Sequence, residues 1–251
     1  MERLQKIMAR AGVASRRHCE DMIRDGLVKV NGRVVHDLPV LVDPSCDTIV
    51  VSGRPLRREH KVYFLLNKPR NVVCTNFDPQ GRRRVVDLIT GVTQRIYPVG
   101  RLDADSKGLL LLTNDGELAN RLTHPRYGVV KTYIAEIDGS LAADEISRLG
   151  RGIYLREAKA SADRIKILRR GPRRSLVEIS LREGRNRQIR RMLVRLGHPV
   201  RRLTRIRIGP LTLHGLGVGR FRQLTTSEVS ALRRLMKDRP AGTGRRPVKT
   251  P

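Results

Sequence analysis

Tryptophan is absent from this 251-residue chain, and all aromatic residues together make up 3% of it. Such a chain lacks the ring platforms on which unstructured single-stranded bases usually stack. The cysteines Cys19, Cys46 and Cys74 are odd in number and have no CxxC spacing, which favours reduced thiols in a cytosol over a disulfide framework or a zinc site. No apolar run approaches the ~20 residues that cross a bilayer, and the first residues lack the apolar stretch of a signal peptide. We therefore expect a soluble cytoplasmic protein without a membrane partner.

Negative charge is also scarce. The chain has 52 Lys and Arg against 24 Asp and Glu, a formal net charge of +28, and an apolar share of 39% that is enough for a folded core. Such a charge indicates a polyanionic partner, because each phosphate that a protein neutralises releases condensed counterions. The basic residues are spread along the chain rather than along one amphipathic helix, which favours nucleic acid over a membrane surface. Because aromatic residues are few, structured RNA is favoured over unstructured strands.

Residues 1–60 have the pattern of a separate small domain. Apolar residues from Leu4 to Ala11 recur at helical spacing, and Ser15 can cap a second helix that ends at Gly26. The alternation in "LVKVNGRVV", centred on an Asn-Gly pair, predicts a β-hairpin. Through "AGVASRR" and "GLVKVNGRVV" this region resembles the S4-like RNA-binding module.

The polar side of the two predicted helices is basic. The resemblance implies that these residues contact RNA, and the alternative is a solvated face on an ordinary small domain. The residues are Arg3, Lys6, Arg10, Arg16 and Arg17.

Residues 61–236 mix short buried strands with helices. "KVYFLLNKP" and "LLLLTNDG" are apolar runs that end in turn residues, whereas "TYIAEIDG" and "SLVEISLREG" alternate as half-buried strands do. "AADEISRLG" and "RQIRRMLVRLG" have helical spacing and end in glycine. We predict an α+β protein in which helices flank a mixed, mostly antiparallel sheet. Residues 237–251 have the composition of a disordered basic tail.

The stretch "GRLDADSKGLLLLTNDG" gathers acids in this basic chain. It begins like a calcium loop, with Asp103, Asp105 and Gly108 at positions one, three and six. Lys107 and Asn114, however, occupy positions five and twelve, where such a loop needs ligands to the ion. We therefore expect no metal site. Turn chemistry accounts for Asp105 and Asp115. Asp103 differs, because it precedes a buried strand in a basic groove, where cationic neighbours would keep it ionised. That is the setting of a carboxylate nucleophile.

This stretch resembles the signature of the RsuA-type family of bacterial ribosomal pseudouridine synthases, in which the aspartate of "GRLD" is catalytic. The segments "LNKPRNVVCT", "KTYIAEIDG" and "EGRNRQIRRMLVRLGHPVRRLTRIRIGPLTL" match other family blocks in the same order. The resemblance covers roughly residues 2–235 and is strongest to the branch that acts on large-subunit ribosomal RNA. It implies an isomerase that needs no cofactor.

The resemblance also implies roles for individual residues. Asp103 would act on a uridine flipped out of its helix, as nucleophile or as base at the sugar. Tyr133 would pack on the uracil and help remove the proton from carbon 5, although its strand pattern also fits a core tyrosine. Arg190 would pair with the catalytic aspartate. Arg187, three residues earlier on the same expected helix face, is the alternative partner.

The remaining basic residues of these blocks are candidate RNA contacts. Arg101 would fill the space that the flipped base leaves, and Lys68 would line the groove unless it points to solvent. The expected phosphate contacts are Arg185, Arg187 and Arg191.

The leading hypothesis is a monomeric synthase that modifies a uridine in a stem-loop of large-subunit (23S) ribosomal RNA. A monomer is expected because a strongly positive surface repels its copies. The alternatives are a small-subunit (16S) ribosomal RNA synthase, a non-catalytic ribosome-assembly factor and a metal-dependent RNA nuclease.

Overall fold

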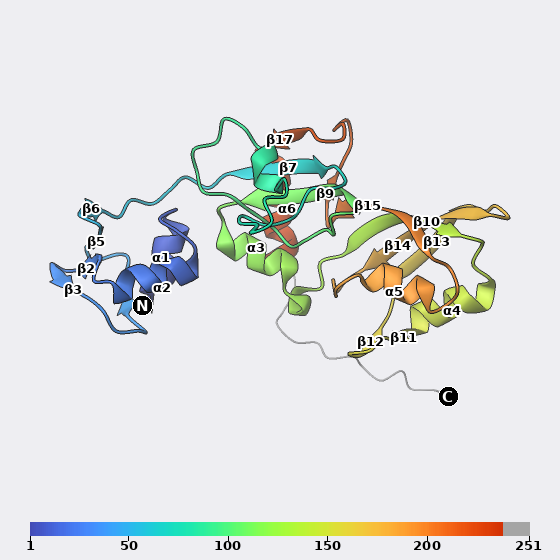
Figure 1. The fold of residues 1–251 in the computed structure, drawn as a ribbon, viewed down its shortest axis with the longest axis horizontal. Helices are drawn as coiled ribbons and strands as arrows, with labels where there is room; N and C mark the ends of the chain where they lie inside the picture. Colours follow the sequence, from blue (N-terminus) through green and yellow to red (C-terminus); the bar gives the residue numbers. More distant parts are fainter. Residues whose placement is uncertain (238–251) are drawn as a thin grey trace. The chain divides into compact units, whose positions relative to one another are not determined.

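The computed structural model describes residues 1–237 and divides the chain into two compact units (Figure 1). One unit holds residues 1–62 together with 91–97 and 113–116, and the other holds 63–90, 98–112 and the chain from 117 on. The predicted boundary at residue 60 stays a prediction, because the first unit also takes in two later segments. Of the predicted tail, residues 237–251, all but Lys237 lie outside the described residues. None of the described helices has the length and hydropathy that a membrane crossing requires.

The first unit packs two helices on small sheets. The hydroxyl of Ser15 accepts a hydrogen bond of 3.2 Å from the backbone N–H of His18 and so caps the second helix. Leu4, Met8, Cys19 and Ile23 bring the apolar faces of the two helices into one core. The helices are α1 (Leu4–Arg10) and α2 (Arg16–Arg24); β1 (Glu2–Arg3) pairs with β4 (Leu41–Val42), and the four-stranded sheet has the order β3 (Arg33–Val34), β2 (Val28–Val30), β5 (Ile49–Val51), β6 (Arg54–Pro55).

The second unit is built on a nine-stranded mixed sheet, which confirms the predicted fold class. Most of its strand pairs are antiparallel, whereas β15 (Val200–Ile208) and β9 (Lys107–Thr113) run parallel. The main path is β13 (Arg164–Arg169), β14 (Arg174–Leu181), β10 (Lys131–Asp138), β15 (Val200–Ile208), β9 (Lys107–Thr113), β7 (Tyr63–Lys68), β17 (Phe221–Gln223); β16 (Leu211–Thr212) pairs with β15, and β8 (Tyr97–Pro98) with β9. A separate hairpin joins β11 (Ile153–Tyr154) to β12 (Lys159–Ala160).

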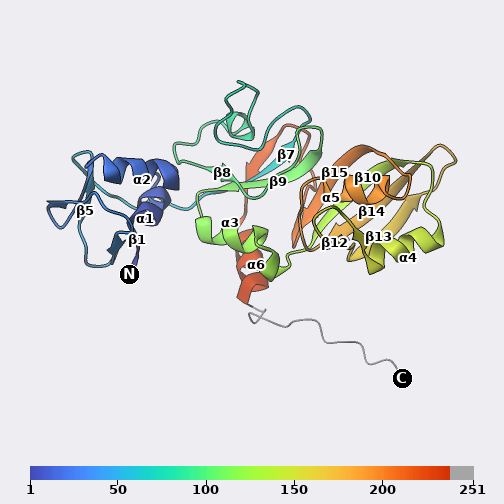
Figure 2. The same ribbon diagram turned by 60° about the horizontal axis from the view of Figure 1, so that its bottom comes forward.

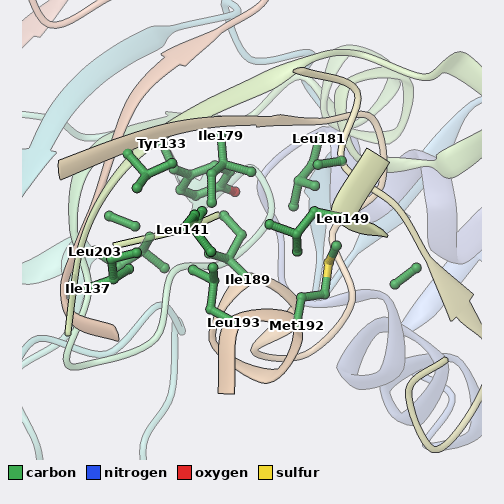
Figure 3. Close-up of a cluster of buried hydrophobic side chains, with 14 of the residues drawn as sticks. Tyr133, Ile137, Leu141, Leu149, Ile179, Leu181, Ile189, Met192, Leu193 and Leu203 are labelled. Carbon is green, nitrogen blue, oxygen red and sulfur yellow. The ribbon is translucent and has the colours of Figure 1, made fainter. Parts of the chain in front are cut away.

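Helices flank this sheet, as Figure 2 shows from a second direction. The alternating strands β10 and β14 direct one face toward α4 and α5, where Tyr133, Ile179, Leu149, Ile189 and Leu193 share one apolar cluster (Figure 3). A second cluster joins β7 and β9 to α3 and α6. The helices are α3 (Gly116–Thr123), α4 (Ala143–Arg151), α5 (Gln188–Val194) and α6 (Thr226–Lys237), with short 3-10 turns at Val85–Leu88 and Pro125–Tyr127.

Strand β9 lies at the centre of the site described below. Its leucines Leu109 to Leu112 are all 0% exposed, as expected for a strand that is covered on both faces. Gly108, at its start, has φ of +112°, and a Cβ atom there would lie 2.2 Å from the backbone oxygen of Arg205 on the parallel neighbour β15. Only glycine permits this approach. The loop before β9 is therefore held tightly against β15.

Candidate active site

Asp103 lies in the loop that leads from β8 into β9. The backbone N–H of Ser106 donates a 3.0 Å hydrogen bond to the carbonyl of Asp103, and the N–H of Asn71 donates one of 2.7 Å to the carbonyl of Ala104. The backbone of the loop is thus fixed from within and from the chain that follows β7. The Asp103 side chain itself remains 31% exposed.

Lys68 fixes the same loop from the interior of the protein. Its side chain is 0% exposed, and its ammonium group donates hydrogen bonds to the carbonyl oxygens of Pro69 at 2.9 Å, Asp103 at 3.2 Å and Ser106 at 2.8 Å. Burial lowers the pKa of this lysine, although the nearby acids oppose that shift. The structure therefore places Lys68 in the protein interior, where it positions the loop, and not on the groove wall where we expected it.

Two arginines reach the acids of this loop. Nη1 of Arg187 lies 3.4 Å from Oδ2 of Asp103 and 3.3 Å from Oδ2 of Asp105. Nη2 of Arg190 lies 3.1 Å from Oδ2 of Asp105 and 3.3 Å from Oγ of Ser106, and its Nη1 donates a 2.8 Å hydrogen bond to the carbonyl of Val200. Within residues 1–237, the direct ion pair to Asp103 thus comes from Arg187, and Arg190 acts on the neighbouring acid.

One expectation about these arginines is wrong. We placed Arg187 and Arg190 on one helix face, but α5 begins at Gln188, and Arg187 is its N-cap with φ of +47°. This left-handed conformation is uncommon for a residue with a side chain. It turns the guanidinium of Arg187 out of the helix path and toward the acids.

Charge balance in this group is set by burial and by neighbours. Burial raises the pKa of Asp105, but Arg190 and Arg187 outweigh it and hold that pKa below its usual value. Burial likewise lowers the pKa of Arg190, against the opposing effect of Asp105. An arginine remains charged at neutral pH in any case. The loop therefore presents Asp105 as an ionised acid to two fixed cations.

Asp103 and Tyr133 line one cavity of about 240 Å³. Tyr133 projects from β10, is 8% exposed and belongs to the apolar cluster (Figure 3). It also borders the cavity. The two expectations for this residue, core packing and a place in the site, are thus met by one position. The apolar side chains of the lining include Leu102, Leu181, Ile189 and Leu203. Its basic side chains are Arg101, Arg185 and Arg187.

The other candidate RNA contacts differ in how free they are. Arg191 pairs with Glu157 at 2.6 Å and Arg185 with Glu183 at 3.0 Å. In the first unit, Lys6 and Arg10 lie 2.9 Å and 3.1 Å from the carboxylate of Glu2. Arg3, Arg16 and Arg17 are exposed, and no acid of the described chain pairs with them.

Two buried cations near the site were missed in the sequence. Arg205 is 2% exposed, and its Nε donates a 2.7 Å hydrogen bond to the carbonyl of Leu109. Lys131 is 9% exposed and donates to the carbonyl of Val129 at 3.1 Å. Burial, assisted by the charge of Arg205, lowers the pKa of Lys131 to about 8. The available signal was the alternation of β10, in which Lys131 shares a strand face with Tyr133.

Comparisons with known proteins find matches for both parts of the chain. Residues 62–194 match the RNA pseudouridylate synthase family, and residues 2–48 match the S4 domain. The ribosomal large subunit pseudouridine synthase B of Bacillus subtilis is 49% identical over 94% of this chain and 97% of its own. The protein of that name from Pseudomonas aeruginosa is 40% identical over 92% of this chain and 61% of its own. A crystal structure of a pseudouridylate synthase, 31% identical, matches with a TM-score of 0.66 over 92% of this chain and 100% of its own.

The fold and the cavity thus define an RNA-modifying enzyme with an S4 domain at its N-terminus. The chain belongs to the RNA pseudouridylate synthase family and is therefore an isomerase that forms pseudouridine. The resemblance to the RsuA-type synthases and to the S4 module is confirmed.

Proposed function

We propose that this protein converts one uridine in a stem-loop of large-subunit (23S) ribosomal RNA into pseudouridine. The observation that carries the proposal is that Asp103, paired with Arg187, lines one cavity together with Tyr133. The two relatives named ribosomal large subunit pseudouridine synthase B support the choice of RNA. The formal charge of +28 favours such a polyanion.

The reaction changes the uracil atom that is bonded to the ribose, from a ring nitrogen to ring carbon 5. The bond between the ribose and the nitrogen breaks, and a bond between the ribose and carbon 5 forms. Carbon 5 loses a proton and the nitrogen gains one, so that atoms and electrons balance without a redox step. The target base must first leave its helix, which costs a few kcal/mol that contacts to the RNA must offset.

The proposal gives a part to each candidate residue in and around the cavity. Asp103 acts on the nucleotide, as nucleophile or as base at the sugar, and Arg187 pairs with its carboxylate and orients it. Tyr133 packs its ring on the flipped uracil, and its hydroxyl helps remove the carbon 5 proton. Arg190 is a positioning residue, because it acts on the loop through Asp105 and Ser106. Arg101 fills the space that the base leaves.

The rest of the chain serves RNA binding and location. We assign residues 1–60 to RNA binding and residues 61–236 to catalysis. Phosphates are contacted by Arg185 and Arg191 and by the basic residues of the S4 domain. The protein acts as a monomer, and a ribosomal substrate implies a cytoplasmic protein.

Tritium release tests the activity, and mapping tests the target. Purified protein should release tritium from ribosomal RNA that is labelled at uracil carbon 5. Ribosomal RNA from cells that lack the protein should lose a pseudouridine in the 23S molecule, and expression of the wild-type protein should restore it.

Other results would favour the alternatives. Loss of a pseudouridine from the 16S molecule instead would move the target to the small subunit. Absence of tritium release from any ribosomal RNA would favour a non-catalytic assembly factor. RNA cleavage that stops on addition of a chelator would favour a nuclease.

A further inference from the structure

Two further cavities of the second unit lie next to the catalytic cavity. The first, of about 650 Å³, shares Arg185 with the catalytic cavity. The second, of about 410 Å³, shares Arg151 and Lys159 with the first. The cavities therefore lie in a row from the catalytic cavity to the end of α4 and the β11–β12 hairpin. Figure 1 shows this helix and this hairpin close together. We name the two further cavities together the flanking groove. Its defining residues are Arg148, Arg151, Tyr154, Lys159 and Arg185.

The flanking groove carries uncompensated positive charge. Asp163 neutralises Arg182, which also lines the groove, at 2.6 Å. Arg185 pairs with Glu183 through Nη2, but its Nη1 is buried and has no hydrogen-bond partner. Arg148, Arg151 and Lys159 are exposed, and no acid in residues 1–237 lies within ion-pair distance of them. The groove thus offers three cationic side chains without an acidic partner, together with the unpaired Nη1 of Arg185, to an anion that comes from outside the chain.

An exposed aromatic ring lies among these cations. Tyr154 is 71% exposed in a protein with little aromatic surface, and Nζ of Lys159 lies 5.8 Å from the centre of its ring. The pairing of Tyr154 with Lys159 across β11 and β12 fixes the backbone that carries both residues. A ring flanked by cations is the usual platform for a nucleic-acid base, with phosphates held at its sides.

We infer that the flanking groove binds the single-stranded nucleotides next to the target uridine and stacks one of their bases on Tyr154. This inference rests on the proposed function, because the nucleotide in the catalytic cavity remains joined to its neighbours. The neighbouring nucleotides extend out of the catalytic cavity. Arg185 lines both this cavity and the flanking groove. An acidic protein segment would be attracted by the same charges, but its carboxylates would not stack on the exposed ring of Tyr154.

The test compares two RNA hairpins that have the same stem and target uridine. One has a tight loop, and the loop of the other is longer by about six single-stranded nucleotides beside the target. Dissociation constants are measured across a salt series for the full-length wild type and two triple variants. The groove variant carries Arg148→Gln, Arg151→Gln and Lys159→Gln. The matched control loses the same charge from the exposed side of β13 through Arg164→Gln, Lys166→Gln and Arg169→Gln.

We expect the wild type and the control to bind the long loop about tenfold more tightly than the tight loop. The groove variant should lose this preference, and its slope of log affinity against log salt should fall by about two. Tyr154→Ala should also lose most of the preference, whereas Tyr154→Phe should keep it. A wild type without preference, or equal losses in the two triple variants, would overturn the inference.

Two further outcomes separate this inference from its alternatives. If the groove variant keeps the RNA preference but loses binding of a poly-glutamate peptide, the groove is a site for acidic protein and the inference is overturned. Tritium release from the tight-loop hairpin by the wild type reports on the proposed function alone. Release without a loop preference would refute only the groove, whereas a loop preference without release would refute only the proposed function.

Discussion

Arg187 and Asp103 form an open ion pair, with 44% and 31% of their side chains exposed. Exposed pairs contribute little to the free energy of unfolding, typically below about 1 kcal/mol. The left-handed backbone of Arg187 nevertheless costs about 1 kcal/mol or more for a residue with a side chain. A backbone conformation that costs free energy, at a residue whose ion pair adds little stability, is typical of a functional site.

The first prediction separates positioning from stability at Arg187. Arg187→Gln should lower kcat roughly tenfold or more and leave the free energy of unfolding within about 0.5 kcal/mol of the wild type. Arg187→Lys should restore part of kcat, because it returns the charge without the planar fork. Single-turnover tritium release and urea unfolding measure the two quantities. A variant that unfolds more easily but keeps its kcat would show that the residue is structural.

The second prediction concerns the buried ammonium of Lys131. Its pKa falls from the usual 10.5 to about 8 in the folded chain, so the unfolded state binds more protons than the folded state between these values. Below pH 8 both states are protonated, and the folded state pays the full cost of a buried charge. As the pH rises from 8 to 10.5 this cost disappears, and stability should rise by about 3 kcal/mol through this group.

Lys131→Met removes the titration. The variant should exceed the wild type in free energy of unfolding at pH 7, and the difference should shrink toward pH 10.5. Urea unfolding at several pH values measures it. A difference that stays constant over this window would show that Lys131 does not titrate as proposed.

At the scale of elements, the contact between β9 and β15 fixes the loop that carries Asp103. Gly108→Ala would bring a Cβ atom to 2.2 Å from the backbone oxygen of Arg205 at an unfavourable φ of +112°. We expect a loss of at least ~2 kcal/mol in the free energy of unfolding. Gly81→Ala is the matched control, since its φ is +66° but nothing lies within 4 Å of the added atom. Equal losses in the two variants would exclude the close approach as the cause.

The elements were largely predictable from local patterns, but the site was only partly so. The alternation of β10, the leucine run of β9 and the serine cap of α2 are local signals, and the structure contains all three elements. The role of Lys68 was not predictable, because its ammonium meets carbonyl groups about 35 residues later in the chain. The start of α5 was misplaced by one residue, since helix ends depend on local backbone geometry. That single residue decides which arginine contacts Asp103.

At the scale of the molecule, the charge of +28 is unevenly available. In the S4 domain, Lys6 and Arg10 share the carboxylate of Glu2, whereas Arg3, Arg16 and Arg17 are exposed without an acidic partner. Acids within the chain thus already compensate part of the basic surface. We expect the uncompensated residues to dominate the binding of phosphates.

The fourth prediction tests this division. Arg3→Gln, Arg16→Gln and Arg17→Gln together should weaken binding of ribosomal RNA and flatten the salt dependence by about two to three in slope. Lys6→Gln with Arg10→Gln is the control and should have a smaller effect, because Glu2 already compensates part of their charge and the three arginines without an acidic partner remain. Filter binding over a salt series measures both. A larger effect of the control would show that exposure does not identify the RNA-binding face.

The most direct test of the whole account is the rate of tritium release by Asp103→Asn in a single turnover. We predict a loss of at least about a thousandfold with RNA affinity nearly unchanged, because the variant keeps the shape of the side chain and loses only its charge. Asp105→Asn removes an acid from the same arginine pair and should lose far less. If Asp103→Asn keeps more than a few per cent of the wild-type rate, Asp103 is not the catalytic group and the mechanism proposed above is wrong.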